Sequence, residues 1–178
     1  NDYDSVTYKL PYGFENDHFR LSYRVGEGVT GFMDKSSGRE LLAPGAAPFF
    51  TPLYERTAVR HPSVDCCPEE RERRLLGRNI RGEHAELHAA RLDEVVCRER
   101  GEVFTELELR YSLPGTVHCA LFLKLYEATP RIDLCLQLGK TLSSDIESVF
   151  LPLSLSLDDG QSLYLRKGAE AFRPGVDQ

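Results

Sequence analysis

Residues 103–111 read Val-Phe-Thr-Glu-Leu-Glu-Leu-Arg-Tyr, and apolar side chains recur at every second position of this stretch. One row of the alternation consists of Val103, Thr105, Leu107, Leu109 and Tyr111. The other row carries two glutamates and an arginine, with Phe104 as its apolar member. Because successive side chains of a β-strand point to opposite faces, the pattern predicts a strand with one buried face and one wet face.

The same period of two recurs along the chain. Further apolar rows are Phe19, Leu21, Tyr23 and Val25; Ile132, Leu134, Leu136 and Leu138; and Val149, Leu151, Leu153, Leu155 and Leu157. In residues 117–126 both rows are partly apolar, which predicts a strand covered on both sides. Together these stretches predict a β protein.

Turn residues separate these stretches. The turns are expected at residues 26–28, 34–38, 100–101, 114–115 and 158–160. Asp-Lys-Ser-Ser-Gly at 34–38 suits a tight turn with a positive φ at Gly38. Short strands joined by hairpin-sized loops predict an all-β fold, a large antiparallel β-sandwich that forms a single domain over residues 1–178.

Composition excludes several classes of protein. The 178 residues carry 22 Lys+Arg and 28 Asp+Glu, a formal net charge of −6. This acidic balance argues against nucleic acid and anionic membranes as partners, because phosphate binding requires a concentrated positive surface. No apolar run approaches the ~20 residues that cross a bilayer, and 41% hydrophobic content is too high for a disordered chain.

The first residues of the chain and its cysteines bear on its origin and on its redox compartment. The chain begins Asn1-Asp2-Tyr3-Asp4 and its single methionine is Met33, so we expect a processed product or an excised piece of a longer protein, in which no signal peptide remains. Its cysteines are five, an odd number, and Cys119 and Cys135 fall in predicted strands, where a thiol acts as a small hydrophobe. A reducing, cytoplasmic compartment fits this usage.

Two regions depart from the alternation. The stretch 44–68 contains five prolines, none of which can occupy a central-strand position, and its apolar run 48–54 is expected to cover a sheet edge or dock on a neighbour. The charge run 69–74 is interpreted as a solvated face. For residues 83–90 a short helix and a strand remain equally open.

Metal binding is the first chemistry to consider. On a helix, His84 and His88 share a face, and on a strand Glu86 joins them. A zinc-protease pattern requires a glutamate directly after the first histidine, where the chain has Ala85, and no third ligand follows at a fixed spacing. These residues are candidates for a metal site, but we expect neither a metal nor another cofactor in this chain.

Cysteine and histidine chemistry offer two further candidates. The pair Cys66-Cys67, near His61 and Asp65, is interpreted as loop thiols, because adjacent cysteines cannot both enter one tetrahedral site without strain. A histidine with a carboxylate in a sheet cleft can run acid–base chemistry on sugars. The residues available for it are His118 or His18 with Glu106, Glu108 or Asp133. Each of these residues also lies where a polar side chain is expected.

Three stretches resemble a known family. Residues 14–23 (Phe-Glu-Asn-Asp-His-Phe-Arg-Leu-Ser-Tyr) and 31–41 (Gly-Phe-Met-Asp-Lys-Ser-Ser-Gly-Arg-Glu-Leu) resemble the opening hairpins of a β domain in glycoside hydrolase family 38, which includes the α-mannosidases. The run from Leu125-Tyr126-Glu127 to Pro130-Arg131-Ile132-Asp133-Leu134 resembles a strand of the same domain. The matches are scattered over about residues 5–165.

The resemblance implies a galactose mutarotase-like supersandwich that follows a separate catalytic domain. In that family the zinc ligands and the nucleophilic aspartate lie mainly in the preceding domain, so no catalytic residue is carried over. The chain ends at Val176-Asp177-Gln178 without a closing turn, so its last strands are expected to be missing. The expected role is non-catalytic: packing against the catalytic domain and helping to wall a carbohydrate cleft.

Two alternatives stay open. One is an autonomous carbohydrate-binding module, with candidate sugar-contacting residues Phe122, Tyr126, Tyr164 and His118. The chain has no Trp, the usual stacking residue. The other alternative is a sugar mutarotase or epimerase that uses His118 or His18 with a glutamate.

Overall fold

The computed structural model describes residues 7–10, 12–45, 49–57, 85–143, 145–158, 160–168 and 170–176. Within these residues all regular structure is β, without a helix, and the strands pair antiparallel. The all-β, antiparallel prediction is therefore confirmed. The 83–90 region is also settled in part, because its described residues form a strand.

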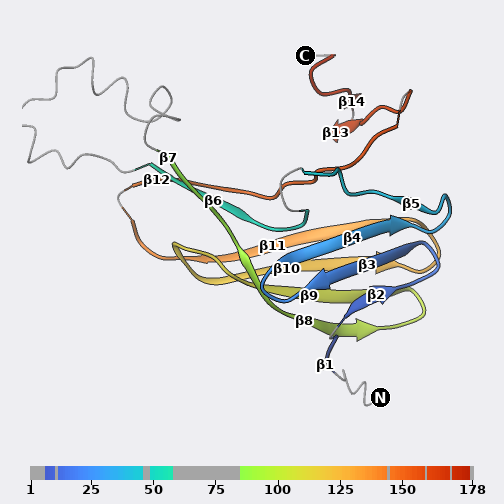
Figure 1. The fold of residues 1–178 in the computed structure, drawn as a ribbon, viewed down its shortest axis with the longest axis horizontal. Coiled ribbons are helices and arrows are strands. Elements are labelled where there is room, and N and C mark those ends of the chain that lie inside the picture. Colours follow the sequence, from blue (N-terminus) through green and yellow to red (C-terminus); the bar gives the residue numbers. More distant parts are fainter. Residues whose placement is uncertain are drawn as a thin grey trace, which may run out of the picture.

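Two sheets form the body of the molecule (Figure 1). The larger has five strands in the order β1 (Tyr8–Lys9), β8 (Arg91–Arg100), β9 (Phe104–Ser112), β10 (Thr116–Tyr126) and β11 (Ile132–Lys140). The four-stranded sheet has the order β2 (Gly13–Glu15), β3 (Phe19–Arg24), β4 (Gly28–Asp34) and β5 (Arg39–Glu40). The two sheets lie face to face, an arrangement consistent with a sandwich.

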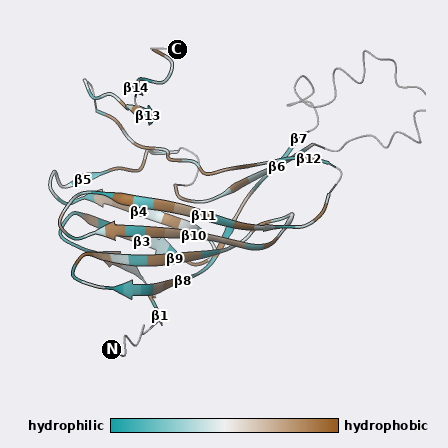
Figure 2. Ribbon diagram, turned by 180° about the vertical axis from the view of Figure 1, so that it is seen from behind, coloured by the Kyte–Doolittle hydropathy of each residue, from teal (hydrophilic) through white to brown (hydrophobic). Residues whose placement is uncertain are grey.

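The core lies between these sheets and comes from the predicted rows. Leu107 and Leu109 of β9 lie opposite Leu123 and Leu121 of β10, and all four are fully buried. Leu21 of β3 joins the same hydrophobic cluster from the four-stranded sheet. Figure 2 shows apolar and polar residues alternating along these strands, as a sheet with one buried face requires.

Aromatic rings extend the core at one end. Phe32 of β4 packs against Phe19 and Phe49 with ring centroids 5.3 Å apart in both pairs, and Phe49 contacts Phe50 at 4.1 Å. Phe50 has a φ of 54°, and the Tyr111 hydroxyl donates to its carbonyl at 2.8 Å. Residues 49–52 are thus buried inside this chain, so they are not free to dock on a neighbour, and Leu53 and Tyr54 of the same run belong to a strand.

Two small sheets complete the fold. One has the order β12 (Ile146–Phe150), β6 (Leu53–Thr57) and β7 (Ala85–Ala89), and the other pairs β13 (Leu165–Lys167) with β14 (Glu170–Phe172). The predicted row 149–157 is strand only as far as Phe150. Beyond it the chain makes an isolated bridge between Leu155 and Leu42, and Leu153 and Leu157 are exposed.

Other expectations are corrected at strand ends. Val25 lies in the turn after β3 and Val103 precedes β9, so both are exposed although they continue apolar rows. The outer row of β10 is not covered by another sheet: Ala120 is buried by its neighbours, Phe122 and Tyr126 are half-buried, and His118 is exposed. Apolar residues at a row's end continue the pattern in sequence but no longer face the core.

Candidate functional site

An open pocket of about 240 Å³ lies where the small sheet of β6, β7 and β12 meets the ends of β10 and β11. We call it the Tyr54–Glu147 pocket. Its walls are Tyr54, Arg56, His88, Pro114, Gly115, Thr141, Leu142, Ser143 and Glu147. Hydroxyl, carboxylate, imidazole and guanidinium groups thus converge in one hollow, where they can donate and accept hydrogen bonds.

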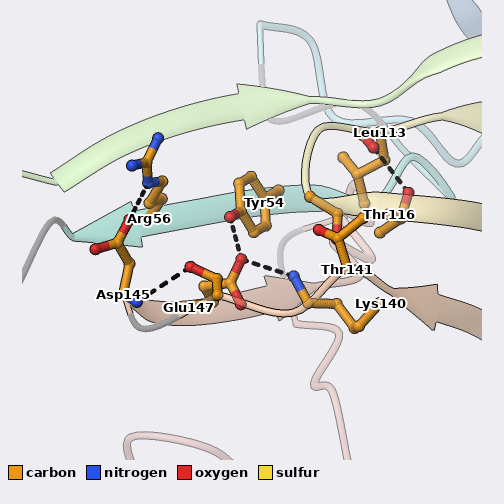
Figure 3. A network of polar contacts seen from close by, with 10 residues as sticks. Tyr54, Arg56, Leu113, Thr116, Lys140, Thr141, Asp145 and Glu147 are labelled. Atoms are coloured by element: carbon orange, nitrogen blue, oxygen red, sulfur yellow. Dashed lines mark hydrogen bonds and ion pairs between the residues drawn. The ribbon is translucent and has the colours of Figure 1, made fainter.

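The centre of the pocket is a tyrosine–carboxylate–lysine contact (Figure 3). The Tyr54 hydroxyl donates a hydrogen bond to Glu147 Oε1, which also accepts one from Lys140 Nζ at 2.8 Å. Lys140 Nζ lies 4.6 Å from the centroid of the Tyr54 ring, a cation–π distance. The Glu147 side chain is only 14% exposed, and the hydrogen bonds from Tyr54 and Lys140 fix the position of its carboxylate.

Strand pairing explains why these side chains meet. Tyr54 of β6 lies opposite His88 of β7 and Val149 of β12, and its ring stacks on His88 with centroids 6.3 Å apart. Glu147 lies two residues before Val149, hence on the same face of the sheet. Lys140 is the last residue of β11 and reaches the pocket from the neighbouring sheet.

A second ion pair, between Arg56 and Asp145, lies beside the pocket. Arg56 Nε contacts Asp145 Oδ2 at 2.5 Å, and the Asp145 amide donates to Ser143 Oγ at 3.1 Å (Figure 3). Arg56 follows Tyr54 by two residues on β6 and is half-exposed. The pocket therefore presents paired charges, and none of its described cations is left isolated for an anionic ligand.

The contact between Tyr54 and Glu147 shifts the pKa of both residues. The Glu147 carboxylate accepts from the Tyr54 hydroxyl, and this bond, with burial, raises the pKa of Tyr54 to about 12. Lys140 and then Tyr54 lower the pKa of Glu147. Since the folded pKa of Glu147 lies below its unfolded value, this carboxylate stabilises the fold above the unfolded pKa, and the contribution is lost as the pH falls through the folded pKa.

Replacing Glu147 by glutamine is expected to bring the pKa of Tyr54 down from about 12 towards its ordinary value of 10.0. The hydrogen bond to the Glu147 carboxylate is the main cause of the raised Tyr54 pKa, and a neutral glutamine no longer repels the tyrosinate ion. Nuclear magnetic resonance titration of ring-labelled tyrosine measures the effect. Glu27→Gln is the matched control, because Glu27 pairs with Arg24 on the surface. An unchanged Tyr54 pKa in Glu147→Gln would contradict the assigned hydrogen bond.

The structure does not bring the predicted sugar-contacting residues together. Phe122 and Tyr126 lie on the outer face of β10, and His118 lies near the other end of that strand, eight residues or roughly 26 Å from Tyr126. The Tyr126 hydroxyl already donates to Asp133 at 2.9 Å. Tyr164 is exposed just before β13, in a different sheet.

The histidine–carboxylate pairs are likewise not assembled. His118 lies opposite Gly139 rather than a carboxylate. Glu108 is buried between Arg110 at 2.7 Å and Arg98 at 3.4 Å, whereas Glu106 lies opposite Lys124. His18 Nε2 contacts the Glu127 carbonyl at 3.0 Å and ties the two large sheets at one end. These residues have structural contacts instead of a shared cleft.

Of the metal candidates, His84 lies outside the described residues. Glu86 and His88 lie two residues apart on β7 and share a face, with Glu86 Oε2 and His88 Nε2 3.7 Å apart. His88 also lines the Tyr54–Glu147 pocket. In the part of the chain that the structure describes, no group of three or more histidine, cysteine, aspartate or glutamate residues is arranged to hold a metal ion.

The cysteines divide by burial. Cys97 and Cys119 are buried free thiols, and burial raises the pKa of Cys119 to about 11, so Cys119 is a hydrophobe as predicted. Cys135 is exposed, which corrects the prediction for it, because it falls on the outer row of β11. Cys66 and Cys67, with His61 and Asp65, lie outside the described residues, as does the charge run 69–74.

Comparison with known proteins gives no relative. No family model matches the chain, and neither a curated protein nor a solved structure matches it. In the described ranges, no helix is long and apolar enough to cross a membrane.

Proposed function

We propose that this chain is a non-catalytic β-sandwich domain of a glycoside hydrolase similar to family 38, with a galactose mutarotase-like fold. In this proposal it packs against a separate catalytic domain of the same protein and contributes to carbohydrate binding. Zinc, where the parent protein uses it, is held by the catalytic domain. The proposal starts from the family resemblance of the opening hairpins and is supported by two features of the structure.

The observation that carries the docking role is the exposure of several apolar side chains after β12. Exposed apolar residues between positions 150 and 165 are Phe150, Leu153, Leu157, Leu163, Tyr164 and Leu165. Exposed apolar side chains mark an interaction surface where they form a contiguous patch, and we propose that the catalytic domain covers these six. A neighbouring domain that covers residues 150–165 would remove this surface from solvent.

The Tyr54–Glu147 pocket supports the carbohydrate role. Its ionised carboxylate, its hydroxyls on Thr141 and Ser143 and its imidazole can bond to sugar hydroxyls as donors and acceptors. The volume of about 240 Å³ suits one sugar ring or the end of a chain. All the walls of this pocket come from this chain, and this favours an autonomous carbohydrate-binding module as the second candidate.

Calorimetric titration with mannose and galactose oligomers tests the carbohydrate role. We expect measurable heats for the unmodified chain, at least a tenfold loss of affinity in Glu147→Gln, and no loss in the surface control Glu27→Gln. Flat heats for the unmodified chain would reject the pocket as a sugar site. Equal binding by Glu147→Gln would reject the role of its carboxylate.

The non-catalytic assignment has its own test. The isolated chain is expected to leave aryl mannosides intact, with or without added zinc. The readout is the release of the coloured phenol over hours at neutral pH. Hydrolysis by the purified chain, lost when the same preparation is heat-denatured, would overturn the assignment.

A further inference from the structure

The outer edge of β11 is open. This strand pairs with β10 without a register shift from Leu125↔Ile132 to His118↔Gly139. No other strand of the described chain pairs with it. At the opposite edge of the same sheet, the short strand β1 pairs with Val96 and Cys97 of β8. A long, regular and unpaired edge is a template for another strand.

Hydrogen-bond parity shows which groups are free. The Tyr126 amide donates to the Arg131 carbonyl at 3.1 Å, so this pair and every second pair along the ladder exchange hydrogen bonds. Leu134 and Leu136 fall between these bonded pairs, as do Ile132 and Leu138. Their amide and carbonyl groups therefore point away from β10, towards the open edge.

The side chains of this edge give it little protection. Residues 132–138 read Ile-Asp-Leu-Cys-Leu-Gln-Leu, with no proline and with Asp133 as the only charge. Leu134 and Leu138 point to the core side of the sheet, yet each remains 37% exposed. Natural edge strands are usually guarded by lysine, proline or a bulge, and this stretch has none of the three.

The pattern is symmetric about Cys135. If two copies of β11 pair antiparallel around this residue, Ile132 faces Leu138 and Leu134 faces Leu136, so the apolar rows match completely. On the outer face, the Asp133 carboxylate of one copy faces the Gln137 amide of the other, which can donate to it. No like charges lie opposite each other, and the free amides and carbonyls of both edges fall on bonded positions.

We propose that β11 is a homodimerisation edge: a second copy of this chain adds its own β11 antiparallel, centred on Cys135, and joins the two five-stranded sheets into one. This use of the edge is separate from the docking surface at residues 150–165. The match of apolar rows and of the Asp133–Gln137 contact selects a second copy as the occupant. The two Cys135 thiols then face each other across a non-bonded pair.

A disulfide probe tests the register. In such a pair the Cα atoms lie about 4.5 Å apart, which is within the range of ~4.4–6.8 Å that a disulfide needs. In a Cys66→Ser/Cys67→Ser background, oxidation with diamide should convert most of the chain to a covalent dimer. Cys135→Ser should abolish it, because Cys97 and Cys119 are buried. Moving the thiol with Cys135→Ser/Gln137→Cys should not restore it, since the two thiols are then offset by four residues.

The oligomeric state tests the edge itself. Sedimentation at micromolar concentration should give twice the 20.1-kDa mass of the chain, and Leu134→Lys/Leu138→Lys should give a monomer. Leu87→Lys, on the exposed row of β7, is the matched control and should remain dimeric. Circular dichroism shows whether each variant is folded. A monomeric unmodified chain, equal crosslinking by the variant with the moved thiol, or a complex with another protein in place of the dimer would overturn the proposal.

Discussion

Replacing Leu121 by alanine is expected to lower the free energy of unfolding by about 3 kcal/mol, because truncating a buried leucine loses its transfer energy and leaves a cavity. Leu121 is fully buried at the centre of β10, opposite Leu109 and Leu136. Urea unfolding followed by far-ultraviolet circular dichroism measures the change.

Leu87→Ala provides the control for Leu121→Ala. Leu87 is also a strand leucine but is 60% exposed, so its truncation should change stability by less than about 0.5 kcal/mol. Equal losses in the two variants would show that the core does not lie between the two large sheets.

Replacing Gly115 by alanine is expected to have the second large effect, a loss of about 2–5 kcal/mol in the free energy of unfolding, from two causes. Gly115 has a φ of +71°, a conformation that costs any L-residue ~1–2 kcal/mol. An added Cβ would also lie 2.8 Å from Cζ and the hydroxyl oxygen of Tyr54, and such overpacking typically costs ~1–3 kcal/mol. The Tyr54 ring must then move away from Gly115, which disturbs its hydrogen bond to Glu147.

Gly38→Ala separates the two causes. Gly38 has nearly the same φ, +69°, but no atom lies within 4 Å of the position that an alanine methyl group would take there. Its unfolding free energy should therefore fall only by the backbone cost of ~1–2 kcal/mol. Chemical unfolding gives both values, and the Tyr54 titration shows whether the ring has moved. If Gly115→Ala cost no more than Gly38→Ala, Tyr54 would not occupy the space against the turn.

The fold is predictable from the sequence where burial is one-sided. The rows of β3 and β9 are regular because each of these strands has one face in the core, so apolar residues recur at every second position of the sequence. For β10, whose outer row is also partly apolar, the same pattern led to the wrong expectation of cover on both sides. The turns at 34–38 and 114–115 carry their own signals, since Gly38 and Gly115 both adopt positive φ. The residues of these strands and turns are therefore enough to predict them.

The pocket is not predictable in the same way. Tyr54 lies in the proline-rich stretch, whose composition favours an edge-covering segment, whereas Pro52 only precedes a short strand. Glu147 and Lys140 read as polar residues at the ends of two strands. Their contact with Tyr54 requires β12 to pair with β6, two strands that are far apart in the sequence. The alternation of apolar residues does not show which strands pair. The Pro114-Gly115 turn can be recognised in the sequence, but its contact with Tyr54 arises only from the tertiary structure.

The pairing of β6 with β12 has a consequence for the order of folding. The Tyr54 hydroxyl and its carboxylate acceptor are 93 residues apart in sequence, whereas β8 to β11 are joined by short hairpins. Closing a long loop costs entropy before its contacts repay it, so distant pairings tend to form late and slowly. On a ribosome, the hairpins can form as they emerge, but the tyrosine has to wait until Glu147 has been synthesised.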